Sequence, residues 1–433
     1  MISKPKGTYD VLPEEARVWV KIETIIRKIC ALSNYEEIRT PIFESAKVFH
    51  RDESDSSDMV NKETYDFLDR GNREMTLRPE GTAGVVRSYI ENKLYVNQGT
   101  TKLFYLGPMF RYERQQKGRY RQFSQFGLEA FGSDSPLLDV DIITTAINLL
   151  EAIGLKGIRV RINTLGDKES RDRYRDVLVE YFSKHIDSLC SDCHERLAKN
   201  PLRILDCKVD KDSEILANCP KISDYLNDAS KAHFNTVLDT LRKMNIDYVV
   251  DEKLVRGLDY YSNTVFELEY TSEDFGSQNV ICAGGRYNNL VKDLGGPETS
   301  AVGLAFGIDR LILALEHENK KIVKDKMLHA YLITLGDEAF NYGSILLNDL
   351  RKAGFMVDMD YSVRSLKGQF KLADKNSSRF VLILGEDELN NNTINVKDQV
   401  SGNQETVKLD ELKEYLLSHF VSKCQGCKGE NHE

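Results

Sequence analysis

The last quarter of the chain alternates strand and helix patterns, and this order is the strongest constraint on its fold. After residue 326, three strand-like segments (HAYLITLG, FMVDMDY and RFVLILG) are separated by helical patterns near 340–353 and 366–375. Strands that alternate with helices form β-α-β units, whose strands lie parallel. We therefore predict a small α/β domain over residues 326–422, with a largely parallel sheet and a polar tail at 423–433.

Residues 1–325 mix strand and helix patterns without this regular order. Apolar residues recur at helical spacing in two segments, 13–31 and 137–153, and a glycine-punctuated stretch leads into a third helix after 307. The polar run at 51–61 predicts an exposed loop. Strand-like alternation occurs at four places, 103–131, 157–165, 248–270 and 280–283.

Residues from about 167 to 247 are charged and helix-like and lack the alternation of strands. This texture predicts a helical insertion within the first domain. Because 433 residues exceed the usual size of one compact domain, we predict an α/β protein of at least two domains, 1–325 and 326–422.

The composition excludes several classes of protein. Hydrophobic residues make up 41% and charged residues 29%, which excludes a wholly disordered or collagen-like chain. With 59 basic and 68 acidic residues the formal charge is −9, so any nucleic-acid contact needs a local basic patch. No stretch approaches the roughly 20 apolar residues of a membrane helix, and the first residues lack a signal-peptide pattern. We therefore expect a cytoplasmic protein without membrane contact.

Several common nucleotide and metal motifs are missing. The sequence contains no GxxxxGK[ST], no GxGxxG after a strand and no HExxH. If the protein binds a nucleotide, side chains rather than a glycine-rich loop must hold the phosphates.

The segment LFYLGPMFRYERQQKGRYRQFSQFGLEAF at 103–131 is the richest in candidate site residues. Residues 102–121 contain six basic side chains and one acid, Glu113. On the second strand Gln125 and Glu129 share one face, because alternate residues of a strand point the same way. Guanidinium groups suit phosphate oxygens, so the pattern fits a ligand-binding floor. It also fits a half-exposed hairpin with a charged turn.

Three later segments add further candidates. LVRGLDYYSNTVFE carries Arg256 next to a pair of tyrosines, AGGRYN carries Tyr287, and GLAFGIDR places Arg310 at a helix start. A helix N-terminus with a planar cation suits a phosphate or a nucleobase. Each segment alone also fits a structural interpretation, with tyrosines in the core and a solvated arginine.

Together with KGTYDVLP, TPIFE and TLRPEGTAG, these segments resemble the motifs of class II aminoacyl-tRNA synthetases. LVRGLDYY and GGRYN resemble the histidyl-tRNA synthetase family in particular, and the resemblance covers essentially the whole chain. It implies an antiparallel-sheet catalytic domain with a helical insertion, followed by an anticodon-binding α/β domain. The implied reaction joins L-histidine to ATP as histidyl-adenylate, releases pyrophosphate, and transfers histidine to the 3′ end of tRNA(His).

The resemblance implies a role for each residue that matches a family motif. It assigns the α-amino end of histidine to Glu80, Thr82 and Gln125. It assigns the imidazole to Glu129 and Tyr261, with Tyr260 and Tyr287 lining the pocket.

The same resemblance implies the contacts of ATP and of the acceptor stem. Arg111 would bind the α-phosphate and the histidine carboxylate, Glu113 would orient the nucleotide, and Arg310 would stack on adenine and reach the γ-phosphate. Arg256 would stabilise charge that develops at the α-phosphate, so Arg256 and Arg111 are the implied catalytic residues. Mg²⁺ would bridge the phosphates, and Arg114 and Gln116 would contact tRNA.

The anticodon-binding domain has a candidate surface for RNA. Five basic residues are spaced by 3, 4, 4 and 4 positions and would form one stripe on a helix: Arg364, Lys367, Lys371, Lys375 and Arg379. The first three are our candidates for tRNA contact. A merely solvated face is the alternative.

Four cysteines of the insertion also have two interpretations. Cys190, Cys193, Cys207 and Cys219 fit either a zinc site with four thiolate ligands or reduced thiols in a helical segment. We favour reduced thiols and assign no metal.

The resemblance also predicts a homodimer, because the helix at 13–31 and the strand near Pro41 resemble the motif that forms the subunit interface in class II enzymes. The alternative function is a synthetase-like regulatory subunit of ATP phosphoribosyltransferase in histidine biosynthesis. Such subunits lack the anticodon-binding domain, whereas a domain follows residue 326 here.

Overall fold

A computed structural model of the chain describes residues 2–51, 58–96, 99–114, 118–257, 260–272, 279–323, 327–362 and 364–421. The chain forms two compact units, Met1–Val323 and Lys324–Glu433. No helix in the described part of the chain combines the length and apolar character needed to cross a membrane.

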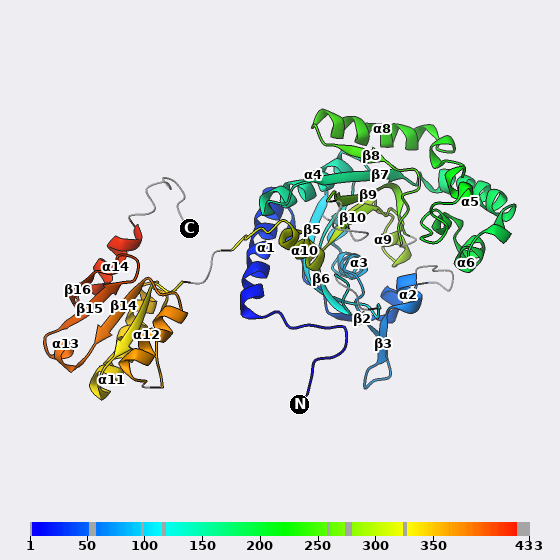
Figure 1. Cartoon of the computed structure of the whole chain (residues 1–433). Helices are drawn as coiled ribbons and strands as arrows, with labels where there is room; N and C mark the ends of the chain where they lie inside the picture. Colours follow the sequence, from blue (N-terminus) through cyan, green and yellow to red (C-terminus); the bar gives the residue numbers. More distant parts are fainter. Residues whose placement is uncertain are drawn as a thin grey trace. The chain divides into compact units, whose positions relative to one another are not determined.

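An eight-stranded sheet forms the centre of the first unit (Figure 1). Its strands are, in spatial order, β1 Glu36–Glu37, β5 Thr101–Phe110, β6 Gln122–Phe131, β11 Ala301–Gly307, β10 Val280–Arg286, β9 Ser262–Tyr270, β7 Ile158–Thr164 and β8 Tyr248–Val250. Neighbouring strands from β5 to β7 are antiparallel, and only β1 and β8 pair in parallel at the two edges. The antiparallel catalytic sheet that the resemblance implied is confirmed.

Helices cover one face of this sheet. They are α1 Pro13–Leu32, α4 Pro136–Ile153, α8 Asp228–Lys243 and α10 Ile308–His317. Local sequence sets the ends of α4, because Ser135 caps its first turn, Pro136 opens it, and Gly154 ends it in the left-handed region (φ 93°). Phe126, Leu128 and other alternate residues of the strands pack under these helices.

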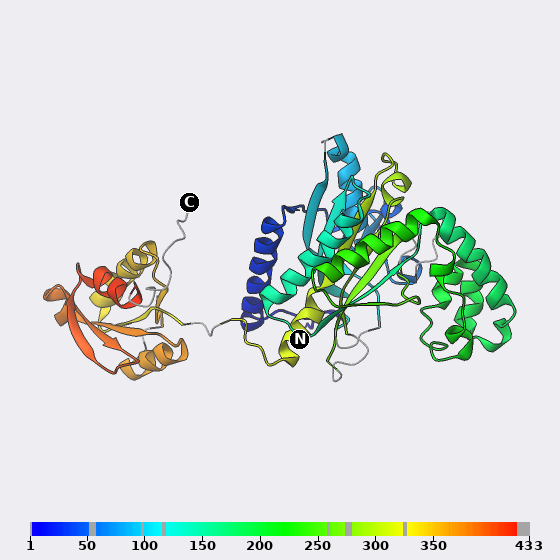
Figure 2. The same cartoon turned by 90° about the horizontal axis from the view of Figure 1, so that it is seen from above.

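The opposite face of the sheet carries the polar side chains. Next to it lie α3 Thr82–Glu91, α9 Leu290–Asp293 and the helices between β7 and α8. The latter are α5 Lys168–Ser183, η3 Ile186–Ser188, α6 Ser191–Lys199, η4 Pro201–Ile204, α7 Glu214–Ala217 and η5 Ile222–Asp224. Figure 2 shows α5 and α6 at the end of the unit that lies away from α1, as does Figure 1.

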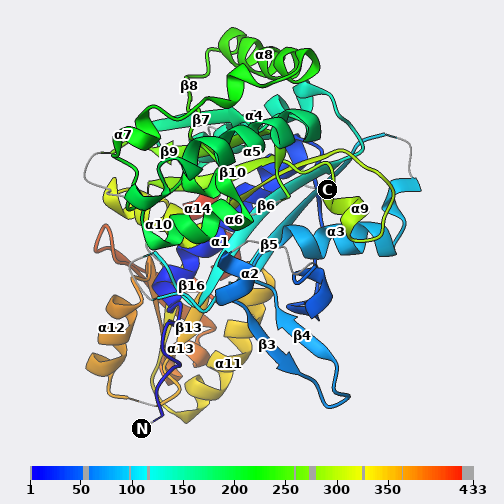
Figure 3. The same cartoon turned by 90° about the vertical axis from the view of Figure 1, so that its right-hand side faces the viewer.

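A small sheet projects from the first unit (Figure 3). It consists of β2 Phe43–Ser45, β4 Glu74–Leu77 and β3 Tyr65–Leu68, with the short elements η1 Ala46–Val48, α2 Asp58–Lys62 and η2 Leu94–Val96 nearby in the chain. The prediction of a loop at 51–61 is wrong for its last part, because α2 begins at Asp58. Residues 52–57 lie outside the described part.

The second unit contains a five-stranded sheet. Its order is β13 Val357–Met359, β12 Ala330–Thr334, β14 Phe380–Leu384, β15 Thr393–Asp398 and β16 Gln404–Lys408. The first three strands are parallel, whereas β15 and β16 join as an antiparallel pair that the sequence analysis missed. The helices are α11 Asp337–Lys352, α12 Leu366–Lys375, α13 Glu386–Asn390 and α14 Leu412–Val421. Helices α11 and α14 pack on one face and α12 on the other.

The predicted basic stripe is only partly helical. Lys367, Lys371 and Lys375 lie exposed on α12, while the buried Gln369 fixes the helix to β12 through two hydrogen bonds with the Thr334 backbone (3.1 and 3.0 Å). Arg364 precedes the helix and pairs with Asp360 (3.0 Å). Arg379 follows it and pairs with Asp398 (2.7 Å). A single helical stripe of five residues is therefore wrong, because α12 ends at Lys375.

Candidate active site

A cavity of about 460 Å³ opens on the polar face of the large sheet. It brings together residues that lie up to 230 positions apart, from Glu80 to Arg310. Of the residues predicted from the sequence, nine line it: Glu80, Thr82, Arg111, Glu113, Gln125, Arg256, Tyr260, Tyr261 and Arg310. Glu129 and Tyr287 lie buried behind this wall, with 0% and 1% of their surface exposed.

Glu129 is a buried carboxylate that accepts two neutral hydrogen bonds. The Thr82 hydroxyl donates to Oε1 at 2.7 Å, and the Tyr287 hydroxyl donates to Oε2. The pKa of Glu129 is raised to about 8, mainly by burial and less by the nearby Glu80 carboxylate, while the two hydroxyl donors oppose this shift. An uncompensated carboxylate beside a cavity is suited to a ligand that donates N–H groups or carries a positive charge.

Glycine provides the space that this carboxylate occupies. Gly303 lies directly opposite Glu129 in the β6–β11 pair, and a Cβ atom at 303 would lie 1.8 Å from Glu129 Oε2. On β6, a Cβ at Gly127 would lie 2.3 Å from the ring of the buried Tyr105. The floor of the pocket therefore depends on backbone without side chains at these two positions.

A buried ion pair anchors the strand end that carries Tyr287. Arg286 is fully buried and pairs with Asp139 of α4 (2.7 Å). Its guanidinium also donates to the carbonyl groups of Ser133 (2.9 Å) and Ser135 (2.5 Å). Because Arg286 points into the helix-covered side, the next residue, Tyr287, reaches Glu129 on the other side.

Glu80 and Gln125 supply acceptors at the cavity wall. The Glu80 carboxylate accepts the backbone N–H groups of Thr82 (2.5 Å) and Ala83 (2.9 Å) at the start of α3. Gln125 Oε1 is buried, and no described residue donates a hydrogen bond to it. Buried amide oxygens are usually hydrogen-bonded, so this atom marks a place for a ligand donor.

Three tyrosines form the adjacent wall. The Tyr260 ring lies 4.8 Å from Tyr261 and 5.7 Å from Tyr287, measured between centroids. Burial raises the pKa of Tyr261 to about 12, and the Arg256 cation opposes this shift. The hydroxyl is therefore neutral at pH 7 and can donate a hydrogen bond.

The other end of the cavity carries arginines. Arg111 donates from Nε to the Pro79 carbonyl (2.8 Å) and lies over the Phe123 ring (5.1 Å). Arg310 donates to the Val280 carbonyl (3.0 Å), and burial lowers its pKa. Glu113 pairs with both Arg111 (3.7 Å) and Arg119 (3.1 Å). Fixed guanidinium groups of this kind suit the oxygens of phosphate groups.

Arg256 has a partner that the sequence analysis missed. It forms an ion pair with Glu267 of β9, and its buried Nε has no hydrogen-bond partner among the described residues. Glu267 also pairs with Arg161 of β7 (3.3 Å). The LVRGLDYYSNTVFE segment contains Glu267, but no local pattern could show that β9 would turn it back towards Arg256.

Two other predictions fall elsewhere. Arg114 is exposed and does not line the cavity, and Gln116 lies outside the described residues. The proposed set of four thiols needs correction, because Cys190, Cys193 and Cys207 gather with Asp210 rather than with Cys219. Cys219 follows α7 in the chain and lies beside Tyr174.

Comparisons with known proteins agree with this geometry. The family pattern described as "Histidyl-tRNA synthetase" matches residues 7–311, and the one described as "Anticodon binding domain" matches residues 329–419. The chain is 49% identical over 419 residues to "Histidine--tRNA ligase" of Bacillus licheniformis, covering 96% of this chain and 99% of the relative. It is 48% identical to the ligase of the same description from Staphylococcus haemolyticus, over 96% of this chain and 99% of the relative.

Solved structures show the same relationship. The apo histidyl-tRNA synthetase of S. aureus superposes with a TM-score of 0.83 and 42% sequence identity, over 96% of this chain and 100% of that one. A structure described as an ATP phosphoribosyltransferase regulatory subunit/histidyl-tRNA synthetase from Bacillus halodurans is only 22% identical, with a TM-score of 0.63 over 89% of this chain and 98% of that one, and shows a shared fold alone. The comparisons therefore support the synthetase interpretation over the regulatory alternative. The chain belongs to the histidyl-tRNA synthetase family.

Proposed function

We propose that this protein is a histidine–tRNA ligase, which activates L-histidine with ATP and transfers it to tRNA(His). One observation carries the proposal. A single cavity carries a group of arginines, and directly behind its wall lies the buried Glu129 carboxyl group, which the Thr82 and Tyr287 hydroxyls hold. Such a cavity matches an amino acid with a nitrogen-bearing side chain next to a triphosphate.

Glu129 and Tyr261 would recognise the imidazole. In its ionised form Glu129 can accept a ring N–H, so histidine binding would draw off the proton that the raised pKa leaves on the free carboxyl group. The neutral Tyr261 hydroxyl can donate to the other ring nitrogen. The α-amino group would bind Glu80 and the unpaired Oε1 of Gln125. Thr82 was expected at the amino group, but its hydroxyl donates to Glu129, so it would orient the imidazole-binding carboxylate.

Arg111, Arg256 and Arg310 would bind and polarise the phosphates. The histidine carboxylate is already a nucleophile, so attack at the α-phosphorus needs alignment and charge stabilisation rather than a base. Arg256, held by Glu267, would face the charge that develops on the α-phosphate. Tyr260 and Tyr287 would shape the histidine pocket between them.

Mg²⁺ would accompany ATP. It takes carboxylate and phosphate oxygens, and Glu113 and Glu267 offer carboxylates on the cavity wall. These two residues would hold the ion together with the phosphates. The bound ion would neutralise negative charge on the leaving pyrophosphate.

The second unit would bind the anticodon region of tRNA(His). The exposed Lys367 and Lys371 of α12 offer phosphate contacts one helical turn apart. Arg364 would contribute less, because its guanidinium already pairs with Asp360. Arg114 and Gln116 would contact the acceptor stem, and charging would take place in the cytoplasm.

A homodimer would form through the first unit. The small sheet exposes Ile42, Phe43, Phe67 and Leu68, and the two phenylalanine rings pack 6.4 Å apart. Exposed apolar side chains such as this Phe43–Phe67 pair indicate a protein interface, and identical chains would pair by twofold symmetry. Sedimentation should therefore give a dimer, and Phe43→Glu should shift it towards monomer. A stable monomer of 49.4 kDa in dilute physiological buffer would contradict the dimer.

ATP–pyrophosphate exchange measured with each amino acid tests the main proposal. Only histidine should support exchange, and tRNA(His) should then accept the activated histidine. Glu151→Gln, at an exposed position of α4 outside the cavity lining, serves as a control for folding. Exchange with another amino acid, or none with histidine, would refute the assignment.

A further inference from the structure

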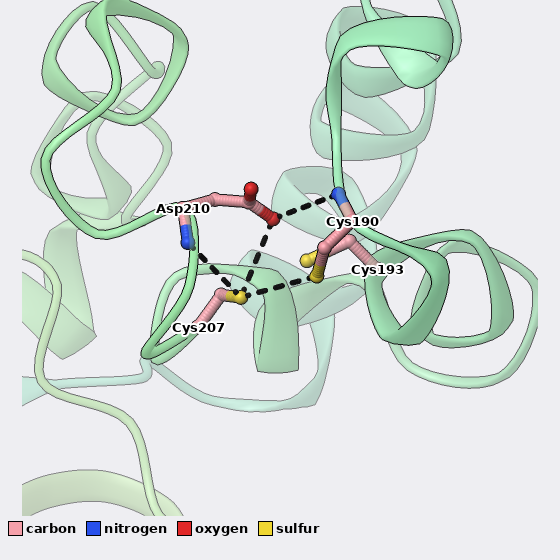
Figure 4. A group of neighbouring side chains, drawn as sticks. All are labelled: Cys190, Cys193, Cys207 and Asp210. Atoms are coloured by element: carbon pink, nitrogen blue, oxygen red, sulfur yellow. Dashed lines mark hydrogen bonds between the residues drawn. The ribbon is translucent and has the colours of Figure 1, made fainter.

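Three cysteines and an aspartate of the insertion converge on one point (Figure 4). Cys190 caps the N-terminus of α6 and Cys193 lies in its first turn, while Cys207 and Asp210 follow η4. Cys193 and Cys207 are almost completely buried, at 0% and 2% exposure. We propose that these four residues bind a structural Zn²⁺ ion that holds the insertion against the active site.

The spacing of the ligand atoms fits tetrahedral zinc. With Zn–S near 2.3 Å and Zn–O near 2.0 Å, tetrahedral geometry puts two sulfurs about 3.8 Å apart and a sulfur and an oxygen about 3.5 Å apart. The Cys190 and Cys207 sulfurs are 3.6 Å apart, and Cys207 Sγ lies 3.3 Å from Asp210 Oδ2. All four ligand atoms lie within 4.8 Å of one another.

The surrounding backbone holds the ligands in place. The Cys190 N–H donates to Asp210 Oδ2 (3.1 Å), which turns the carboxylate towards the thiols. The Asp210 N–H points at Cys207 Sγ (3.5 Å), and the Cys193 N–H donates to the Cys190 carbonyl (2.9 Å). N–H groups that point at sulfur favour the thiolate form that zinc requires.

A disulfide and metal-free thiols are the two alternatives to zinc, and neither fits the four residues as well. A disulfide needs two sulfurs about 2.05 Å apart, whereas these lie at 3.6 Å and a third thiol lies beside them. Reduced thiols without metal would leave three of them and a carboxylate crowded together with no cation among them. Zinc accounts for all four residues at once.

The site is joined directly to the cavity wall. Asp206 and Lys208, the two neighbours of Cys207, both line the cavity. A metal that fixes Cys207 against α6 therefore fixes the backbone between them. Loss of the metal should loosen this wall and weaken substrate alignment. This coupling rests on the proposed function, whereas metal binding does not.

Metal analysis of the full-length protein tests the site. All variants are made in a protein that carries Cys424→Ser and Cys427→Ser, because these changes remove the second CxxC pair of the chain. This protein should retain about one zinc ion per chain. Adding Cys207→Ser or Asp210→Asn should reduce zinc content, whereas Cys219→Ser, the matched control, should leave it unchanged.

Titration of metal-free protein with Co²⁺ gives a test that needs no further variant. One equivalent should produce thiolate-to-cobalt charge-transfer bands with the visible bands of tetrahedral cobalt, and Zn²⁺ should displace them. Absence of zinc together with absence of a stoichiometric cobalt spectrum would overturn the site. A Cys190–Cys207 disulfide found by mass spectrometry without reduction would also overturn it.

The coupling has its own readout. Removal of zinc should lower histidine-dependent pyrophosphate exchange and the melting temperature, and Zn²⁺ should restore both. Bound zinc whose removal leaves exchange unchanged would overturn the coupling while the site stands.

Discussion

Glu129→Gln should make the protein more stable at alkaline pH while it weakens histidine binding. Glu129 is fully buried, and its pKa is raised to about 8 from an ordinary 4.5. Between these values the unfolded chain has already released the proton that the folded chain still holds. Stability therefore falls as pH rises through this window, because the folded state binds more protons than the unfolded state.

The size of the effect follows from the shift. A difference of 3.5 pKa units at about 1.36 kcal/mol each corresponds to roughly 5 kcal/mol over the full titration. Between pH 5 and 8.5, titration of Glu129 should lower the free energy of unfolding by about 4 kcal/mol. Glutamine does not titrate, so the stability difference between the variant and the wild type should move by this amount in favour of the variant.

Guanidinium unfolding followed by the fluorescence of Trp19, the single tryptophan, gives the free energy of unfolding of the first unit at each pH. Glu151→Gln, at an exposed position of α4, controls for the loss of a charge. In calorimetry Glu129→Gln should weaken histidine binding about 10- to 100-fold, as expected when a charged hydrogen bond is lost. A stability difference independent of pH would refute the raised pKa, and unchanged affinity would remove Glu129 from the imidazole.

Four further predictions concern the cavity and the second unit. Gly303→Ala should reduce histidine-dependent exchange at least about 100-fold, because its Cβ would lie 1.8 Å from Glu129 Oε2, whereas Ala305→Gly on the same strand should be tolerated. Arg256→Ala should raise the activation free energy of adenylate formation by roughly 3 to 4 kcal/mol and leave histidine affinity nearly unchanged. Lost affinity together with normal single-turnover chemistry would contradict this. Deletion from Lys326 should preserve exchange but abolish tRNA charging, and Lys367→Ala with Lys371→Ala should reduce the salt slope of tRNA affinity by roughly 0.7 to 0.9 per contact. An unchanged slope and affinity would exclude these lysines from the RNA contact.

Much of the local structure was predictable from the sequence. The strand pair β5–β6 follows from two alternating segments around a basic turn, and α1 and α4 follow from apolar spacing with proline at each start. The family motifs marked nine of the residues that line the cavity. These features depend on near neighbours in the chain, because periodicity and capping involve residues only a few positions apart.

The contacts of the site were decided by tertiary structure. Glu129 and Tyr287 are 158 positions apart, and they meet because β6 and β10 lie on either side of β11, where Gly303 leaves room. The same holds for the partnership of Arg256 with Glu267 and for Asp210, which takes the place expected of Cys219. Strand order and register arise from packing between distant segments, so no local pattern reveals which polar groups will be buried together or share a proton.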